Sequence, residues 1–218
     1  MKLYSLPASP FAARCRMMIY AKNLPVDIVE PPGGLGSESY EAINPLRKVP
    51  ALDTGEGVIP ESDTILEYLE DHYPEPSMRP EKALHRSKAR LLARIADLYI
   101  MEPMFPLFML MRSDTPDKAA IARQLDKIDW GLRTLDWYLD NKHGFAVGTH
   151  LSKADCALVP TLVYVTEMLP RFGKDKPLAF RDKLAEYWEG IQGDPHAARV
   201  IEEIREGMAR MAAARAQQ

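Results

Sequence analysis

Three prolines, at positions 74, 76 and 80, separate two parts of this chain that have different hydrophobic patterns. Before them, short apolar runs typical of strands alternate with helical spacing, and after them the apolar residues follow the spacing of amphipathic helices. Proline-rich stretches are typical of domain boundaries. The chain is therefore predicted to fold as an α/β domain over residues 1–77, followed by an all-helical domain over residues 84–218.

The first part is expected to have the order β-α-β followed by β-β-α. Its predicted strands cover residues 2–6, 26–30, 51–53 and 58–59. A helix from Pro10 to about Asn23 joins the first two strands, which requires that they run parallel. The remaining features are a Gly/Pro/Ser loop at 31–39, a hairpin turn at 54–57 and a helix over 62–73.

The second part is expected to be entirely helical. Its predicted helices cover residues 84–112, 117–141, 153–169, 177–192 and 196–215. The segment 101–111 is rich in methionine and phenylalanine and contains two prolines, so a bend is expected there. Near the end, glutamates and arginines are interleaved in a way that predicts a solvated helix face; they are Glu202, Glu203, Arg205, Glu206, Arg210 and Arg215.

Charge and composition exclude several classes of function. A formal net charge of -3 provides no field that would attract nucleic acid or an anionic membrane. No apolar run is long enough to span a membrane, and the first residues lack the pattern of a signal peptide. The two cysteines lie far apart and the five histidines lack metal-ligand spacing, so neither a disulfide framework nor a metal is expected. We expect a cytoplasmic protein without nucleic-acid or membrane partners.

Ser9-Pro10 is the first of three motifs that could carry chemistry. Proline suits the first position of a helix, which makes Ser9 the expected N-cap. A cap uses the hydroxyl oxygen as an acceptor and leaves the hydroxyl hydrogen free to donate. Ser9 could therefore be a structural cap only, or it could also stabilise an anion, such as a thiolate, at the positive end of the helix.

Val49-Pro50 and Glu61-Ser62 are the other two motifs. The first is either an ordinary trans bond before a strand or a cis bond, which would turn the Val49 backbone outward to pair with a peptide-like ligand. In the second, Ser62 is the expected N-cap of the next helix. That helix start could also bind a ligand carboxylate, with Glu61 accepting the neighbouring ammonium.

With Arg14 and Arg16 after Ser9-Pro10-Phe11, then Lys48-Val49-Pro50-Ala51-Leu52 and Glu61-Ser62-Asp63-Thr64-Ile65, the chain resembles the cytosolic glutathione transferase family. The resemblance implies a thioredoxin-like glutathione-binding domain followed by an all-helical domain, in a homodimer. The serine pattern is most similar to the tau class and to the omega class with serine in place of cysteine. Residues 148–155 resemble the family's capping motif, in which Ser152 and Asp155 form a capping box that serves folding.

The resemblance also implies roles for individual residues. Ser9 would activate the thiol of glutathione, which acts as co-substrate. The implied glutathione-binding residues are Phe11, Lys48, Val49, Pro50, Glu61 and Ser62. The implied pocket for a small hydrophobic electrophile is bordered by Pro7, Phe11, Met104, Phe105 and Phe108. Cys15 lies on the apolar face of its helix, where we expect a buried structural residue.

Three activities are compatible with this pattern. In the favoured one, the bound glutathione thiolate attacks a hydrophobic electrophile by conjugation, halide displacement or ether cleavage. The second is isomerisation in the manner of zeta-like members, although the Ser-Ser-Cys pattern of those members is absent around Ser9. The third is a non-catalytic ligand-binding or regulatory protein on the same fold.

Overall fold

The structure is a computed structural model that describes residues 1–110, 117–140 and 143–216. The chain forms two compact units. The first consists of Met1–Arg79 together with Gln192–Gln218, and the second of Pro80–Ile191. The predicted ends of two helices, at residues 111–112 and 141, lie outside the described residues.

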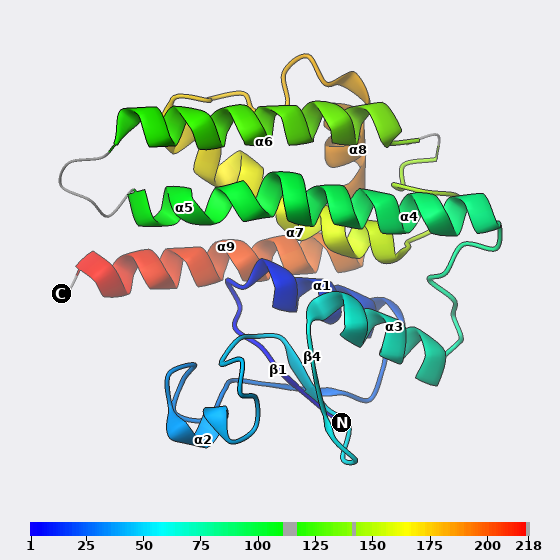
Figure 1. The fold of residues 1–218 in the computed structure, drawn as a ribbon. Coiled ribbons are helices and arrows are strands. Elements are labelled where there is room, and N and C mark those ends of the chain that lie inside the picture. The colour runs from blue at the N-terminus through cyan, green and yellow to red at the C-terminus, as the bar shows by residue number, and fades with distance from the viewer. Residues whose placement is uncertain (111–116, 141–142, 217–218) are drawn as a thin grey trace. The chain divides into compact units, whose positions relative to one another are not determined.

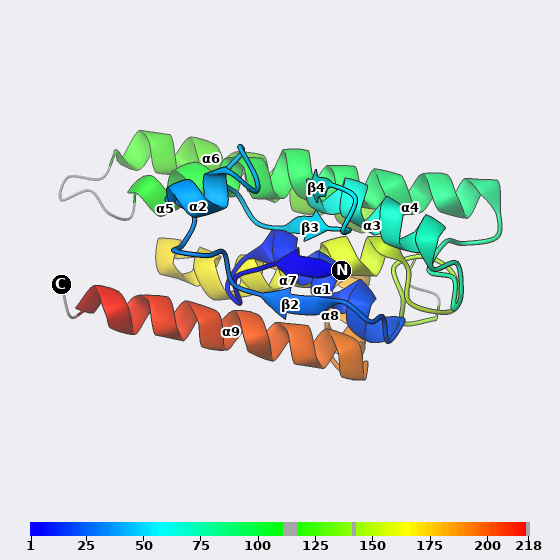
Figure 2. The ribbon, with the colours of Figure 1, turned by 90° about the horizontal axis from the view of Figure 1, so that it is seen from below.

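The first unit is built around a four-stranded mixed sheet. Its strands are β1 (Lys2–Tyr4), β2 (Asp27–Val29), β3 (Ala51–Asp53) and β4 (Val58–Pro60), and their order in the sheet is β2-β1-β3-β4 (Figure 2). β1 pairs parallel with β2, while β3 pairs antiparallel with both β1 and β4. The predicted α/β fold, with its parallel pair and hairpin, is confirmed.

The helices of the first unit are α1 (Pro10–Ala21), α2 (Glu38–Glu41), α3 (Ser62–His72) and α9 (Pro195–Ala216). α1 is buried along most of its length and supplies Ala12, Met17 and Met18 to the core. The short helix α2 extends past the end of the loop predicted at 31–39. It begins after Ser37, whose hydroxyl oxygen accepts the backbone N–H of Tyr40 at 3.1 Å.

The second unit is helical, as predicted. Its helices are α4 (Ala83–Ile95), the π-helix η1 (Ala96–Met101), α5 (Glu102–Leu110), α6 (Lys118–Tyr138), α7 (Lys153–Met168), the 3₁₀-helix η2 (Leu169–Phe172) and α8 (Asp182–Ile191). The irregular turn therefore begins before the segment in which a bend was predicted. The helix predicted over 177–192 begins only at Asp182, because Phe180 has a φ of 64°, which no α-helix accommodates.

The central helix of the second unit is α7, and the predicted capping box at its start is confirmed. The Asp155 carboxylate accepts the backbone N–H and the hydroxyl of Ser152, both at 2.8 Å, the N–H of Ala146 at 2.8 Å and the hydroxyl of Tyr187 at 3.1 Å. Burial raises the pKa of Asp155, and the four donors act in the opposite direction. The motif holds the start of α7 to its surroundings.

The C-terminal helix α9 belongs to the first unit and runs beside α1 (Figure 1). The prediction of one all-helical domain over 84–218 had assigned this helix to the other part of the chain. Across the described residues, no helix is both long and apolar enough to cross a membrane.

Candidate functional site

The sheet register brings the three sequence motifs to one edge. Tyr4 at the end of β1 lies opposite Ala51 at the start of β3, and Ala51 lies opposite Pro60 at the end of β4. The segments that leave the sheet at this edge are therefore the turn after β1, the Val49-Pro50 bond and the Glu61-Ser62 start of α3. Motifs that lie up to fifty residues apart in sequence become neighbours through strand pairing.

Ser9 is the N-cap of α1, as predicted. Its hydroxyl oxygen accepts the backbone N–H of Ala12 at 3.2 Å, and Pro10 occupies the first helical position. Its own backbone N–H donates to the Leu6 carbonyl at 3.0 Å. A serine hydroxyl can accept and donate at once, so the capping bond leaves a donor at the positive end of the helix.

The Val49-Pro50 bond is cis, which settles the alternative that the sequence left open. The residue before it is held firmly, because the Lys48 carbonyl accepts the hydroxyl of Tyr40 at 2.7 Å and the side-chain amide of Asn44 at 2.8 Å. Tyr40 and Asn44 are buried, whereas the Lys48 side chain is exposed. Anchoring of this kind gives the Val49 backbone a defined place at the edge.

The start of α3 differs from its prediction by one residue. Glu61, not Ser62, is the N-cap, and it has a φ of 68°. Since this left-handed conformation is rare for a residue other than glycine, asparagine or aspartate, it costs on the order of 1 kcal/mol. The turn leaves Glu61 exposed and makes Ser62 the first residue of α3, among the backbone N–H groups that have no partner within the helix.

Cys15 is the buried structural residue that was predicted. Its thiol donates to the Ser62 carbonyl at 3.8 Å and so connects α1 to the start of α3. Burial raises the pKa of Cys15 to about 12, with nearby Arg14 and Arg16 acting in the opposite direction. Cys15 is therefore a neutral thiol near neutral pH, and it cannot supply a nucleophile.

The residues predicted to border the electrophile pocket belong to both units. In the first, Pro7 and Phe11 are half-buried, and the Arg14 guanidinium lies 4.8 Å from the centre of the Phe11 ring. In the second, Met104 is fully buried, and the Phe108 ring is 6.3 Å from Phe105 and 5.7 Å from Tyr164. Phe105 is exposed and borders a groove of about 620 Å³ with Tyr99 and Trp130. The pocket itself stays a prediction.

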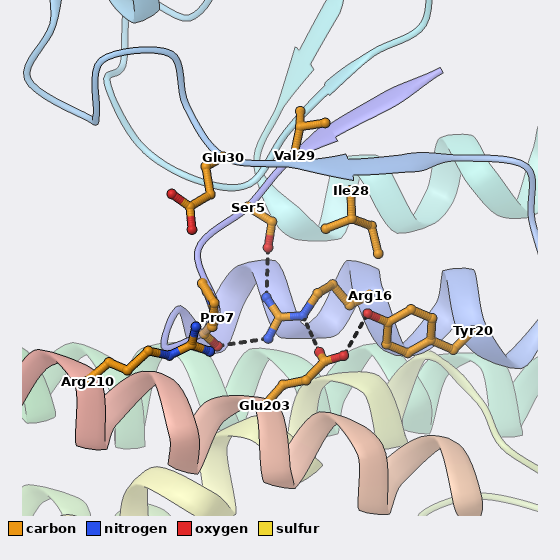
Figure 3. Close-up of a pocket in the computed structure, with 9 residues that line it drawn as sticks. All are labelled: Ser5, Pro7, Arg16, Tyr20, Ile28, Val29, Glu30, Glu203 and Arg210. Carbon is orange, nitrogen blue, oxygen red and sulfur yellow. Dashed lines mark hydrogen bonds and ion pairs between the residues drawn. The ribbon is translucent and has the colours of Figure 1, made fainter.

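Two residues that the motif analysis did not place in the site lie against the turn that carries Ser9. They are Arg16 on α1 and Glu203 on α9, which form an ion pair at 2.7 Å (Figure 3). Both border a pocket of about 260 Å³, together with Ser5, Pro7, Tyr20, Ile28, Val29, Glu30 and Arg210. The expectation that Glu203 belongs to a solvated helix face is wrong. Among the described residues, no group of three or more His, Cys, Asp or Glu side chains could hold a metal ion.

Comparison with known proteins agrees with this geometry. Residues 3–77 match the model of the glutathione S-transferase N-terminal domain, and residues 96–192 match that of the C-terminal domain. A curated relative, maleylpyruvate isomerase from Ralstonia sp., is 34% identical over 173 residues, which is 73% of this chain and 80% of the relative.

Solved structures give the same result. A glutathione S-transferase from Methylobacterium radiotolerans in complex with glutathione sulfonate has a TM-score of 0.77 and 26% identity, covering 92% of this chain and 93% of that one. The holo structure of a maleyl pyruvate isomerase, a bacterial glutathione S-transferase of the zeta class, has a TM-score of 0.72 and 26% identity, covering 92% and 96%. The chain belongs to the glutathione S-transferase family.

Proposed function

We propose that this protein is a glutathione-dependent isomerase that acts on the double bond of a small unsaturated dicarboxylic acid. The observation that carries the proposal is the edge at which a capped Ser9, the cis Val49-Pro50 bond and the start of α3 come together. The similarity to maleylpyruvate isomerase at 34% identity supports isomerisation above conjugation.

The residues at this edge fit glutathione. The first N–H groups of α3, with Ser62, suit the carboxylate of the γ-glutamyl unit, and the exposed Glu61 suits its ammonium. The anchored Val49 backbone suits the peptide of the cysteinyl unit, and the exposed Lys48 suits the glycyl carboxylate. The Ser9 hydroxyl, at the positive end of α1, suits a thiolate.

When bound, glutathione supplies a thiol nucleophile that can add to an activated double bond and then leave it. The contribution of the chain is to hold that thiol ionised and in place. Ser9 donates its hydroxyl hydrogen toward the sulfur while the backbone N–H of Ala12 occupies its oxygen, which keeps the donor aimed. A charge-assisted hydrogen bond and a helix terminus together have the strength to lower a thiol pKa by one or two units, at about 1.4 kcal/mol for each.

Conjugation of glutathione to a hydrophobic electrophile is the second candidate. The Ser9-Pro10-Phe11 pattern favours it, because it departs from the Ser-Ser-Cys pattern of zeta-like members. The aromatic cluster of Phe105, Phe108 and Tyr164 also suits an apolar substrate. The two activities differ in the fate of the thiol, since isomerisation returns it and conjugation consumes it.

A thiol count separates the candidates. With maleylpyruvate as substrate and glutathione well below its concentration, an isomerase completes many turnovers for each glutathione, and the free thiol titre stays constant. With 1-chloro-2,4-dinitrobenzene, a conjugating enzyme consumes one thiol for each product formed. Glutathione binding without turnover of either substrate would contradict both proposals and favour a ligand-binding protein.

Replacement of Ser9 by alanine tests the proposed thiolate donor. We expect the thiol pKa of bound glutathione, measured by ultraviolet absorbance, to rise toward its free value, and kcat to fall about ten- to a hundredfold, the cost of one charge-assisted hydrogen bond. Glutathione affinity should change little. Ser9→Thr keeps the hydroxyl and serves as the control. An unchanged thiol pKa in Ser9→Ala would remove Ser9 from the mechanism.

We further propose that the protein is a cytoplasmic homodimer. The two buried, unpaired cysteines fit a reducing compartment. The second unit exposes an aromatic pair, Tyr99 and Trp130, with ring centres 4.9 Å apart, and exposed apolar groups of this kind are typical of protein interfaces. Light scattering should give twice the 24.6 kDa chain mass. A monomer at micromolar concentration would contradict the proposal.

A further inference from the structure

The guanidinium of Arg16 braces the turn between β1 and α1. Its side chain is only 3% exposed, although it carries a charge. One terminal nitrogen, Nη1, donates to the Ser5 hydroxyl at 2.7 Å and to the Leu6 carbonyl at 3.0 Å, and the other, Nη2, donates to the Pro7 carbonyl at 2.8 Å (Figure 3). One planar group thus fixes three successive residues of the turn.

The same turn fixes Ser9. The Leu6 carbonyl that accepts from Arg16 also accepts the backbone N–H of Ser9 at 3.0 Å. The two donors share one oxygen, so a displacement of the guanidinium changes the position of the carbonyl against which Ser9 is held. Arg16 does not lie at the thiol position that we propose, but it is one hydrogen bond away from the residue that does.

Glu203 on α9 holds Arg16 from the other side. One carboxylate oxygen accepts Nε of Arg16 at 2.7 Å. The second accepts the Tyr20 hydroxyl at 2.8 Å and Nε of Arg199 at 3.2 Å, and the Arg199 guanidinium also lies 3.6 Å from the centre of the Tyr20 ring. Burial, followed by the bond to Glu203, raises the pKa of Tyr20 to about 12, which keeps its hydroxyl a donor near neutral pH. Three donors therefore fix this carboxylate.

We propose that Glu203 and Arg16 are positioning residues through which α9 sets the orientation of the Ser9 hydroxyl. The inference rests on the proposed function, because it requires Ser9 to stabilise the bound thiolate. It goes beyond that function in making the C-terminal helix part of the catalytic apparatus. Small errors in the placement of a catalytic group have large effects on rate, so this support acts on chemistry more than on affinity.

Two substitutions test the proposal. Glu203→Gln keeps the size of the side chain but leaves one oxygen for three donors. Arg16→Lys keeps the charge but cannot form the planar contacts with Glu203, Leu6 and Pro7 at the same time. Glu202→Gln, at an exposed position of the same helix, is the matched control.

We expect Glu203→Gln to raise the thiol pKa of bound glutathione, by no more than Ser9→Ala does, and to lower kcat about three- to tenfold. KM for glutathione should stay within about twofold. In the protein without glutathione, backbone amides of residues 8–9 should exchange with solvent faster than in the wild type. Arg16→Lys should produce the same changes at larger size, and Glu202→Gln should produce none of them.

The double variant with Ser9→Ala decides between positioning and simple stabilisation. If Glu203 acts through Ser9, adding Glu203→Gln to Ser9→Ala should raise the thiol pKa no further. If Glu203→Gln lowers Tm but leaves the thiol pKa at its wild-type value, or if the two effects on thiol pKa add, the proposal is overturned and the cluster is structural. A thiol pKa that is insensitive to Ser9→Ala would instead overturn the proposed function itself, which is a distinguishable result.

Discussion

Ser9 and Cys15 lie on the same helix, yet only one of them can contribute to chemistry near neutral pH. Ser9 occupies the positive end of α1 with a donor to spare. Cys15 is fully buried two turns further on, and the cost of burying a thiolate raises its pKa to about 12. Position along one helix therefore separates a group that stabilises an anion from one that stays neutral.

This difference predicts that thiol reagents leave the native protein unmodified. At pH 8, well below the raised pKa, Cys15 holds its proton, and Cys156 is buried as well. We expect a chromogenic disulfide reagent to react slowly with the native protein and to release two equivalents after denaturation in urea. Rapid reaction of one thiol in the native state would show that α1 does not shield Cys15 as described.

Predictability from sequence at this scale depends on whether the deciding contact is local. Ser9 was recognised because its cap bond closes within three residues. Ser62 was misplaced by one position, because Glu61 takes a left-handed conformation that local propensity disfavours. Glu203 was missed, because its partner Arg16 lies 187 residues away and a charged helix end ordinarily faces solvent.

At the scale of elements, α9 meets the turn before α1 through a glycine. A Cβ atom at Gly207 would lie 2.4 Å from the backbone nitrogen of Ala8 and 2.9 Å from its Cα. Neither atom belongs to a flexible side chain, so any larger residue must move the helix or the turn. Glycine is thus required for close approach, at the usual cost of glycine within a helix.

Gly207→Ala should therefore destabilise the protein despite the better helix propensity of alanine. The overlap costs about 1–3 kcal/mol, whereas propensity returns at most about 1 kcal/mol. Urea unfolding should show this loss, and the displaced turn should raise the thiol pKa of bound glutathione. Gly190→Ala in α8, where a Cβ meets no atom within 4 Å, is the control and should be neutral or stabilising. Equal stability of Gly207→Ala and wild type would contradict the close contact.

The elements themselves were predictable where periodicity was long or turn chemistry was strong. The parallel pair, the hairpin and α3 follow from patterns that agree with the sheet they form. The four-residue α2 is too short for any helical period, and the start of α8 depends on the backbone of a single residue, Phe180. Short range and unusual φ values are the features that patterning cannot report.

At the scale of the whole molecule, the first compact unit is discontinuous in sequence. It contains residues 1–79 and the helix α9, while the second unit occupies the chain between them. α9 contributes buried Val200, Ile201 and Ile204 as well as Glu203. The unit that carries Ser9 is therefore incomplete until the last helix is in place, a property that a division of the sequence at its prolines does not reveal.

Removal of α9 should consequently abolish the glutathione site although every motif residue remains. Burial of each large aliphatic side chain stabilises by roughly 1.5–3 kcal/mol, so loss of Val200, Ile201 and Ile204 removes an amount comparable with the total stability of about 5–15 kcal/mol typical of a protein. Arg16 would in addition lose its carboxylate partner. We expect a chain ending at Ile191 to lose glutathione binding by calorimetry and cooperative unfolding by circular dichroism. A chain ending at Ala212, which removes only the exposed end of α9, should retain both. Wild-type affinity in the shorter chain would show that the first unit needs nothing from α9.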